Sequence, residues 1–149
     1  MGQQQLLLLV LGIVIVGLAV VVGIQAFSEN QKKANADALV NDAIRIASDA
    51  QAWMLKPTAF GGGNNSCATT CDWNGVTFAQ LGYPTGDQPG GDVATAAQYE
   101  NINGVFDMVT GANVVITASN GATGNEVVVT VVGTQSTDIT TVVNASASP

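Results

Sequence analysis

The opening stretch "MGQQQLLLLVLGIVIVGLAVVVGIQAF", residues 1–27, decides how this chain is organised. After three glutamines, the run from Leu6 to Ile24 carries no charged or polar side chain. A helix needs about twenty apolar residues to cross the hydrocarbon of a bilayer, and this run is long enough. It can therefore be a secretory signal, a membrane anchor or a helix that becomes buried in an assembly.

The run lacks the features of a cleavable signal. A secretory signal begins with basic residues and ends at small ones. No basic residue precedes Lys32. A cut after Ala26 would place Ile24 at the third position before it, where a signal sequence usually has a small residue. Leu6 also occupies the place where a myristoylation signal has serine or threonine. The membrane anchor and the assembly helix are thus the two main hypotheses.

An amphipathic segment, residues 28–56, follows the apolar run. Apolar residues repeat every seven positions in three adjacent rows, which form one stripe on a helix. The rows are Ala36, Ala43 and Ala50; Leu39, Ile46 and Trp53; and Val40, Ala47 and Met54. Asn35, Asp42 and Asp49 fall outside this stripe. Because no glycine or proline lies between Ile24 and Lys56, we expect one continuous helix that ends before Pro57.

Residues 57–149 predict a Gly-rich joint and a small β-domain. Gly61, Gly62 and Gly63 form either a flexible joint or a tight loop, and Val76 begins either a short strand or a helical turn. Strand-like runs separated by turn residues then predict an antiparallel meander. These runs are about Tyr99–Val109, Asn113–Ala118, Glu126–Val132 and Asp138–Val143. The expected fold class is α+β, with the long N-terminal helix packed on the sheet through its second half.

The charge distribution excludes several functions. The chain has four basic and eleven acidic residues, and no histidine. All the basic residues precede Pro57, whereas seven of the acids follow it. The β-domain therefore has no cation with which to neutralise nucleic-acid phosphates. Without histidine or a paired constellation of acid and base, we expect no enzyme, no cofactor and no metal site.

Cys67 and Cys71 are the two cysteines. Two thiols without histidine make a poor zinc site, since zinc takes about four protein ligands. A short disulfide in an oxidising compartment is the favoured interpretation, with free thiols as the alternative.

Three weaker motifs lie in the loops. Asp87 and Asp92 share a Gly-rich loop that has the oxygen ligands for calcium but not the EF-hand spacing, so a solvated turn is the favoured interpretation. Asn64 and Asn144 each begin a sequence that fits the N-glycosylation pattern.

The organisation of the chain resembles that of type IV pilins and their pilin-like relatives. The residues that carry the resemblance are the charge-free run Leu6–Ile24 and its unbroken amphipathic continuation, Ser28–Leu55, followed by the Gly-rich joint and a small β-domain. The organisation matches over the whole chain, and the specific motif lies in the first thirty residues. The resemblance implies a subunit that spans the cytoplasmic membrane before assembly. It also implies a prepilin peptidase and an inner-membrane assembly machinery as partners.

The N-terminus departs from the family pattern. In the family the peptidase cuts after a glycine, the new terminus is often a methylated Phe or Met, and the fifth mature residue is usually glutamate. If Met1 is the mature first residue, Gln5 stands at that place; a cut after Gly2 puts Leu7 there. The first register is favoured, because it keeps a polar side chain, Gln5, at the position where the family usually has glutamate. Val22 stands where the family usually has a proline.

These observations predict a structural subunit of an extracellular, pilus-like filament whose main partner is another copy of the same chain. The residues expected to form the assembly stem are Gln5, Leu6, Leu7, Gly12, Val16, Gly17, Gly23 and Ile24. The alternatives are a single-pass membrane-anchored binding domain on the outer side of the membrane and a minor pseudopilin of a secretion system. Adhesion, motility and DNA uptake all use subunits of this kind.

Overall fold

A computed structural model describes residues 2–63, 67, 71–86 and 98–144 of the chain. The chain forms two compact units, Met1–Ala34 and Asn35–Pro149. Helix α1, Gly2–Leu55, runs through the first unit and into the second. Its end agrees with the stop predicted at Pro57, because the residue before a proline disfavours helical geometry.

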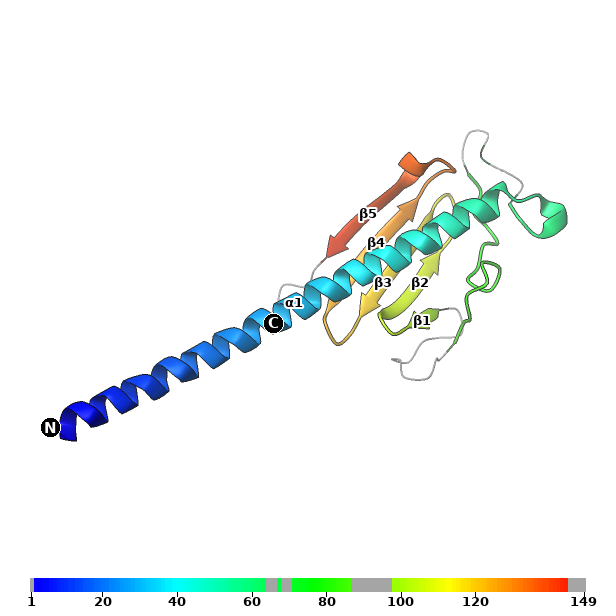
Figure 1. The fold of residues 1–149 in the computed structure, drawn as a ribbon. Coiled ribbons are helices and arrows are strands. Elements are labelled where there is room, and N and C mark those ends of the chain that lie inside the picture. Colours follow the sequence, from blue (N-terminus) through cyan, green and yellow to red (C-terminus); the bar gives the residue numbers. More distant parts are fainter. Residues whose placement is uncertain (1, 64–66, 68–70, 87–97, 145–149) are drawn as a thin grey trace. The chain divides into compact units, whose positions relative to one another are not determined.

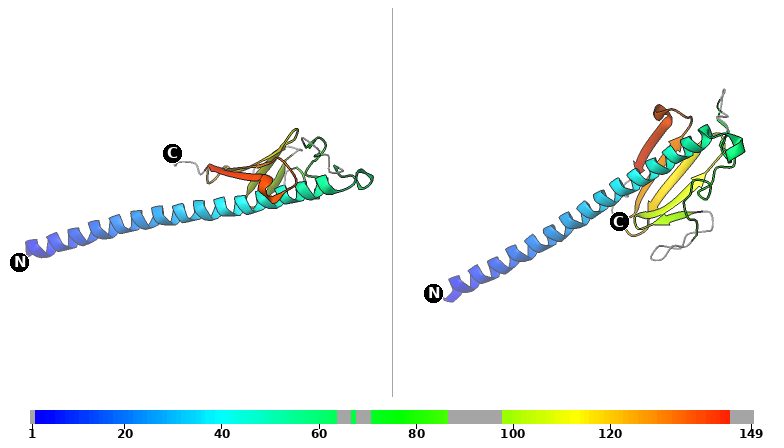
Figure 2. Two further views of the ribbon diagram at one scale, coloured as in Figure 1. Left: turned by 90° about the horizontal axis from the view of Figure 1, so that it is seen from above. Right: turned by 45° about the vertical axis from the view of Figure 1, so that its right-hand side comes forward.

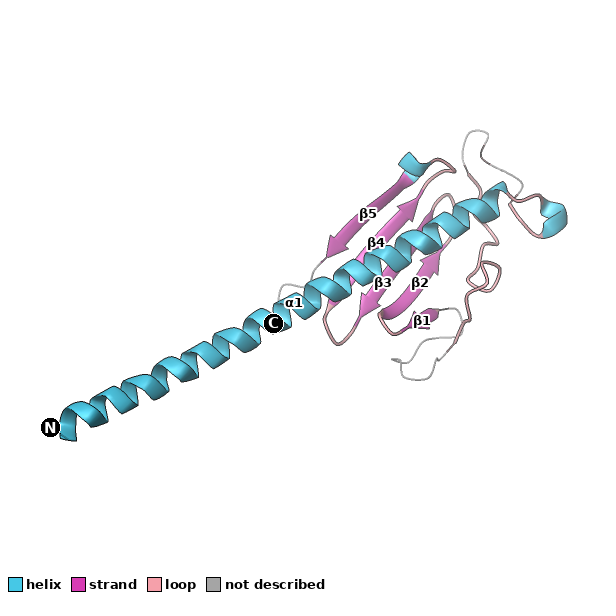
Figure 3. Cartoon of the chain, viewed as in Figure 1, coloured by secondary structure: helices cyan, strands magenta, loops and turns pink. Residues whose placement is uncertain are grey.

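The second unit contains a five-stranded antiparallel sheet with the order β1-β2-β3-β4-β5 (Figures 1 and 3). The strands are β1, Tyr99–Asn101; β2, Gly104–Val109; β3, Val114–Asn120; β4, Asn125–Val131; and β5, Ile139–Asn144. Each strand pairs with the next one along the chain, which confirms the predicted meander and the α+β fold class. Two short 3-10 helices, Thr58–Phe60 and Ser136–Asp138, lie in the connections.

One predicted strand is wrong. The run Tyr99–Val109 forms two strands, β1 and β2, and Asn101 pairs with Gly104 across a tight turn. Ile102 and Asn103 are the two turn residues, and the Asn101 side chain stabilises the turn by accepting hydrogen bonds from the N–H groups of Asn103 and Gly104, as asparagine often does at the start of a turn. The chain therefore reverses where a single longer strand was expected.

The hydrophobic core lies between the second half of α1 and one face of the sheet. In Figures 1 and 2 this part of the helix crosses the strands, which all lie on one side of it. Seven of the nine residues of the predicted apolar stripe are buried, and Ala36 and Val40 are half-buried. They meet alternate side chains of the central strands, namely Phe106, Val114, Ile116, Ala118, Val127, Val129 and Val131. The seven-residue repeat thus predicted the packed face of the helix correctly.

The three consecutive glycines after α1 form a tight loop. The Gly63 N–H donates to the Trp53 carbonyl at 3.0 Å, and the Gly62 N–H donates to the Pro57 carbonyl at 3.2 Å. A Cβ on Gly63 would come within 2.7 Å of the Met54 sulfur. The loop therefore satisfies a helix-terminal carbonyl and packs against the end of the helix, which decides between the two alternatives left by the sequence.

The segment from Asp72 to Gly86 is held to the core by aromatic residues. Trp73 and Phe78 are fully buried, and Tyr83 and Tyr99 pack beside Phe78. The Leu81 N–H donates to the Thr77 carbonyl, so this part of the segment that starts at Val76 is a helical turn.

Replacing Gly104 by alanine is expected to destabilise the β-domain. A Cβ at this position would overlap the backbone carbonyl oxygen of Ser119 and approach the Leu39 side chain, so the β2–β3 pairing must shift. Overpacking of this kind costs about 1–3 kcal/mol. Gly111→Ala is the matched control, because nothing lies within 4 Å of the Cβ it adds. Thermal unfolding of both variants in detergent measures the difference, and equal midpoints would contradict this packing.

Candidate functional site

The largest uncovered apolar surface of the chain is the α1 segment of the first unit. Every leucine, valine and isoleucine from Leu6 to Ile24 is exposed, with exposed fractions from 49% at Val10 to 69% at Leu7. An 18-residue window of α1 near the N-terminus has a mean hydropathy of 3.2, and this helix is long and apolar enough to cross a membrane. So large an exposed apolar surface is unusual in a soluble protein, and it is consistent with a membrane-associated or signal-like segment.

The structure places all eight predicted stem residues on this exposed part of α1. Nothing lies within 4 Å of a Cβ added to Gly12, Gly17 or Gly23. Glycines without neighbours allow the backbone of a second helix to approach closely, which strengthens packing in an apolar environment. We call residues 2–27 of α1, the hydrophobic part predicted from the sequence, the stem.

Polar residues on one flank of the second half of α1 bind the sheet, which the sequence did not predict. The Asp42 Oδ2 atom accepts hydrogen bonds from the side-chain amides of Asn101 at 2.8 Å and Asn103 at 2.7 Å. The Asn35 Nδ2 atom donates to the Asn103 carbonyl at 3.0 Å, and the Asn35 Oδ1 atom accepts from the Thr123 hydroxyl at 2.8 Å. These bonds attach the β1–β2 turn and the β3–β4 turn to the helix.

Asp49 continues the same flank seven residues further along α1. Its carboxylate accepts a hydrogen bond from the Tyr83 hydroxyl. Burial raises the pKa of Tyr83 well above its usual range, and the neighbouring Asp49 carboxylate adds to this effect, whereas Arg45 opposes it. Asn35, Asp42 and Asp49 therefore share one role, because each binds the β-domain to the helix.

The raised pKa of Tyr83 predicts a loss of stability in alkali. A group with a raised pKa in the folded state stabilises the fold fully below its unfolded pKa, here about 10, and loses that contribution as the pH rises further. We expect the thermal midpoint of the full chain to fall above about pH 10, and to fall less steeply in Tyr83→Phe, which has no phenol to ionise. Identical pH profiles for the two proteins would contradict this expectation.

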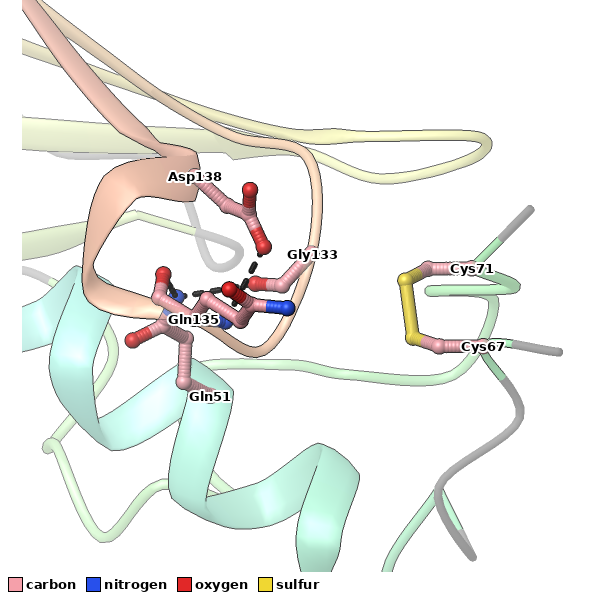
Figure 4. Close-up of a disulfide and its surroundings, with 6 residues drawn as sticks. All are labelled: Gln51, Cys67, Cys71, Gly133, Gln135 and Asp138. Carbon is pink, nitrogen blue, oxygen red and sulfur yellow. Dashed lines mark hydrogen bonds between the residues drawn. A yellow bond between two sulfur atoms is a disulfide. The ribbon is translucent and has the colours of Figure 1, made fainter. Parts of the chain in front are cut away.

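The opposite flank of α1 holds the loop between β4 and β5 (Figure 4). The Gln51 Nε2 atom donates to the carbonyls of Gly133 and Gln135, both at 2.8 Å. Within the loop, the Gln135 N–H donates to the Asp138 carboxylate at 3.0 Å, and the Asp138 N–H donates to the Gln135 carbonyl at 3.0 Å. One glutamine of the helix thus holds a loop that carries its own capping box.

The expected disulfide between Cys67 and Cys71 is present, and Figure 4 shows it facing this loop. A cavity of about 310 Å³ lies between them, with Asn113, Gln135 and Asp138 among its lining residues. Its polar side chains are amides, a hydroxyl and a carboxylate, so the lining residues offer hydrogen bonds but no cationic group. In the described parts of the chain, no group of three or more His, Cys, Asp or Glu side chains is placed to hold a metal ion.

The remaining sequence motifs are mostly not placed. Asn64, Asp87 and Asp92 lie outside the described residues. Asn144 is exposed at the end of β5, where its side-chain amide donates to the Glu126 carboxylate at 3.3 Å. Glycosylation of Asn64 and Asn144 stays a prediction.

Comparisons with protein-family models, with curated proteins and with solved structures found no match. A long N-terminal apolar helix packed on an antiparallel sheet is consistent with a pilin-like or membrane-anchored protein.

Proposed function

We propose that this chain is the structural subunit of an extracellular, pilus-like filament. The observation that carries the proposal is the stem, in which the apolar side chains from Leu6 to Ile24 are all exposed. Burying these side chains is worth roughly 1.5 kcal/mol or more for each residue, which amounts to tens of kcal/mol before the entropic costs are subtracted. Packing among copies of the stem is therefore strong enough to hold a polymer without covalent links.

The absence of a linker supports a filament over a simple anchor. Stem and β-domain share α1, and the sequence has no glycine or proline between Ile24 and Lys56. A binding domain that only has to reach a ligand is usually joined to its anchor by a flexible, Gly-, Ser- or Pro-rich segment. Contacts between the stems of successive copies are heterologous, so they propagate as a helix.

The same segment also accounts for the location of the subunit before assembly. Before polymerisation the stem spans the cytoplasmic membrane, with the β-domain and its disulfide on the oxidising side. Assembly then exchanges lipid for protein partners, so close packing at Gly12, Gly17 and Gly23 contributes more than hydrophobicity alone. By resemblance, a prepilin peptidase and an inner-membrane machinery act on the subunit. Residues 57–149 carry seven acidic residues and no basic residue, and this net negative charge keeps filaments apart in solution.

In this proposal the chain is a structural protein and not an enzyme. A second candidate function is a single-pass, membrane-anchored binding domain, and the apolar length of α1 favours it equally. A minor pseudopilin is a third candidate, which differs from the first in abundance.

Fractionation of sheared cells separates these functions. A filament subunit sediments from the sheared supernatant at high speed without detergent, as a major band, and mass spectrometry of its N-terminus then distinguishes Met1 from Gln3 as the first residue. An anchored domain appears only in detergent extracts of the membrane, and that result would contradict the filament. A trace component of the pellet would indicate a minor pseudopilin.

A further inference from the structure

The turn between β1 and β2 presents an isoleucine directly to solvent. Ile102 has an exposed fraction of 99%, the largest of any apolar side chain among the described residues. Two-residue hairpin turns favour Asn, Asp and Gly, and β-branched residues suit them poorly. Nothing in the formation of the turn therefore requires an isoleucine at this position.

The backbone on both sides of Ile102 is held rigidly. The Asn101 Oδ1 atom accepts hydrogen bonds from the N–H groups of Asn103 at 2.9 Å and Gly104 at 3.1 Å. The Asn103 carbonyl also accepts from the Asn120 side chain at 2.6 Å. Together with the bonds from Asn101 and Asn103 to Asp42 on α1, these contacts fix the turn at both asparagines. An apolar side chain on such a turn is preorganised, so little entropy is lost when it binds a partner.

From this arrangement we propose that Ile102 is an assembly contact that packs against a second copy of the chain. The proposal rests on the filament function and names a residue of the β-domain that takes part in it. Ile102 lies in an uncharged turn, Asn101–Gly104, on a domain whose charged residues after Pro57 are all acidic. Two copies of such a domain repel each other except where uncharged surface meets uncharged surface.

The second copy also supplies the apolar surface that Ile102 needs. The stem exposes apolar side chains along Leu6–Ile24. Asn35, which is hydrogen-bonded to the Ile102 turn, lies on α1 eight residues after Phe27, the last residue of the stem. The turn is thus attached to the helix close in sequence to the segment on which the proposed polymer depends.

The test compares three full-length proteins: the wild type, Ile102→Asn and Ile102→Val. Asparagine suits the turn and adds no charge, whereas valine keeps an apolar contact. We expect Ile102→Asn to reduce the yield of sedimented filament at least about tenfold, the effect of losing an interface hot spot. Its thermal midpoint in detergent should stay within about 3 °C of the wild type, because an exposed side chain contributes little to stability. Ile102→Val should assemble like the wild type.

Two results would overturn the contact while leaving the filament intact: a normal filament yield for Ile102→Asn, or a large fall in its thermal midpoint, which would make Ile102 a structural residue. A wild type that does not sediment would overturn the filament itself. A photo-crosslinking amino acid at position 102 identifies the partner. Irradiated filaments should give a covalent dimer of this chain, and a crosslink only to another protein would contradict the proposal.

Discussion

Replacing Gly17 by aspartate is expected to abolish filaments while leaving the β-domain folded. Gly17 lies in the middle of the apolar run, and nothing within the chain approaches a Cβ at this position, so the free subunit accommodates the new side chain. In a packed bundle of stems the same carboxylate is buried without a partner, which costs about 3–5 kcal/mol for every subunit, and its side chain also separates helices that pack closely at this glycine. Because each subunit contributes this cost, even a short filament becomes unstable.

The yield of sedimented filament from sheared cells measures this effect, and we expect a loss of at least about tenfold. An aspartate at the centre of a spanning helix costs about 3 kcal/mol on insertion, which the many leucine, valine and isoleucine residues of the stem outweigh. The variant should therefore still be found in the membrane with its disulfide formed. Val16→Asp should behave in the same way. Ser136→Asp, which adds the same charge on an exposed turn, is the control and should assemble normally. A wild-type yield from Gly17→Asp would count heavily against the packed stem.

Replacing Ile46 by alanine is expected to destabilise the β-domain by about 2–5 kcal/mol. The Ile46 side chain has an exposed fraction of 1% and lies in the core between α1 and the sheet. Its truncation removes buried apolar surface and leaves a cavity that neighbouring side chains fill only in part.

Ile44 offers a control on the same helix. It is also an isoleucine, but its exposed fraction is 38%, compared with 1% for Ile46. Ile44→Ala should cost much less than Ile46→Ala in chemical denaturation of the full chain in detergent. Equal losses of unfolding free energy would show that the predicted stripe does not define the packed face.

The sequence was most informative where periodicity is strict. Seven-residue spacing places Leu39, Ile46 and Trp53 on one face of a helix, and this geometry holds whatever the strands are. The meander was predictable for a similar reason, since turn residues separate short runs in which apolar and polar residues alternate. The β1–β2 hairpin was missed because Tyr99–Val109 was treated as one run, although it contains Asn101, Asn103 and Gly104, residue types that are common in turns.

The polar attachments of the helix were not predictable in the same way. Asn35, Asp42 and Asp49 are also spaced by seven, but a polar row beside an apolar stripe is equally typical of a solvent-facing flank. Their partners, Asn103, Asn101 and Tyr83, are 34 or more positions away in the chain. Only the folded sheet brings these groups into hydrogen-bonding distance. The regular spacing of the three residues was the one available signal.

Image reconstruction of the sheared, detergent-free pellet by electron cryomicroscopy tests the central claim most directly. The account predicts helical filaments made of this chain, with the stems packed together along the filament axis and the β-domains outside. In such filaments the side chains from Leu6 to Ile24, all exposed in the single chain, become buried against other copies. A pellet without filaments of this chain, with the protein found only in membrane extracts, would contradict the account and leave the stem as an anchor.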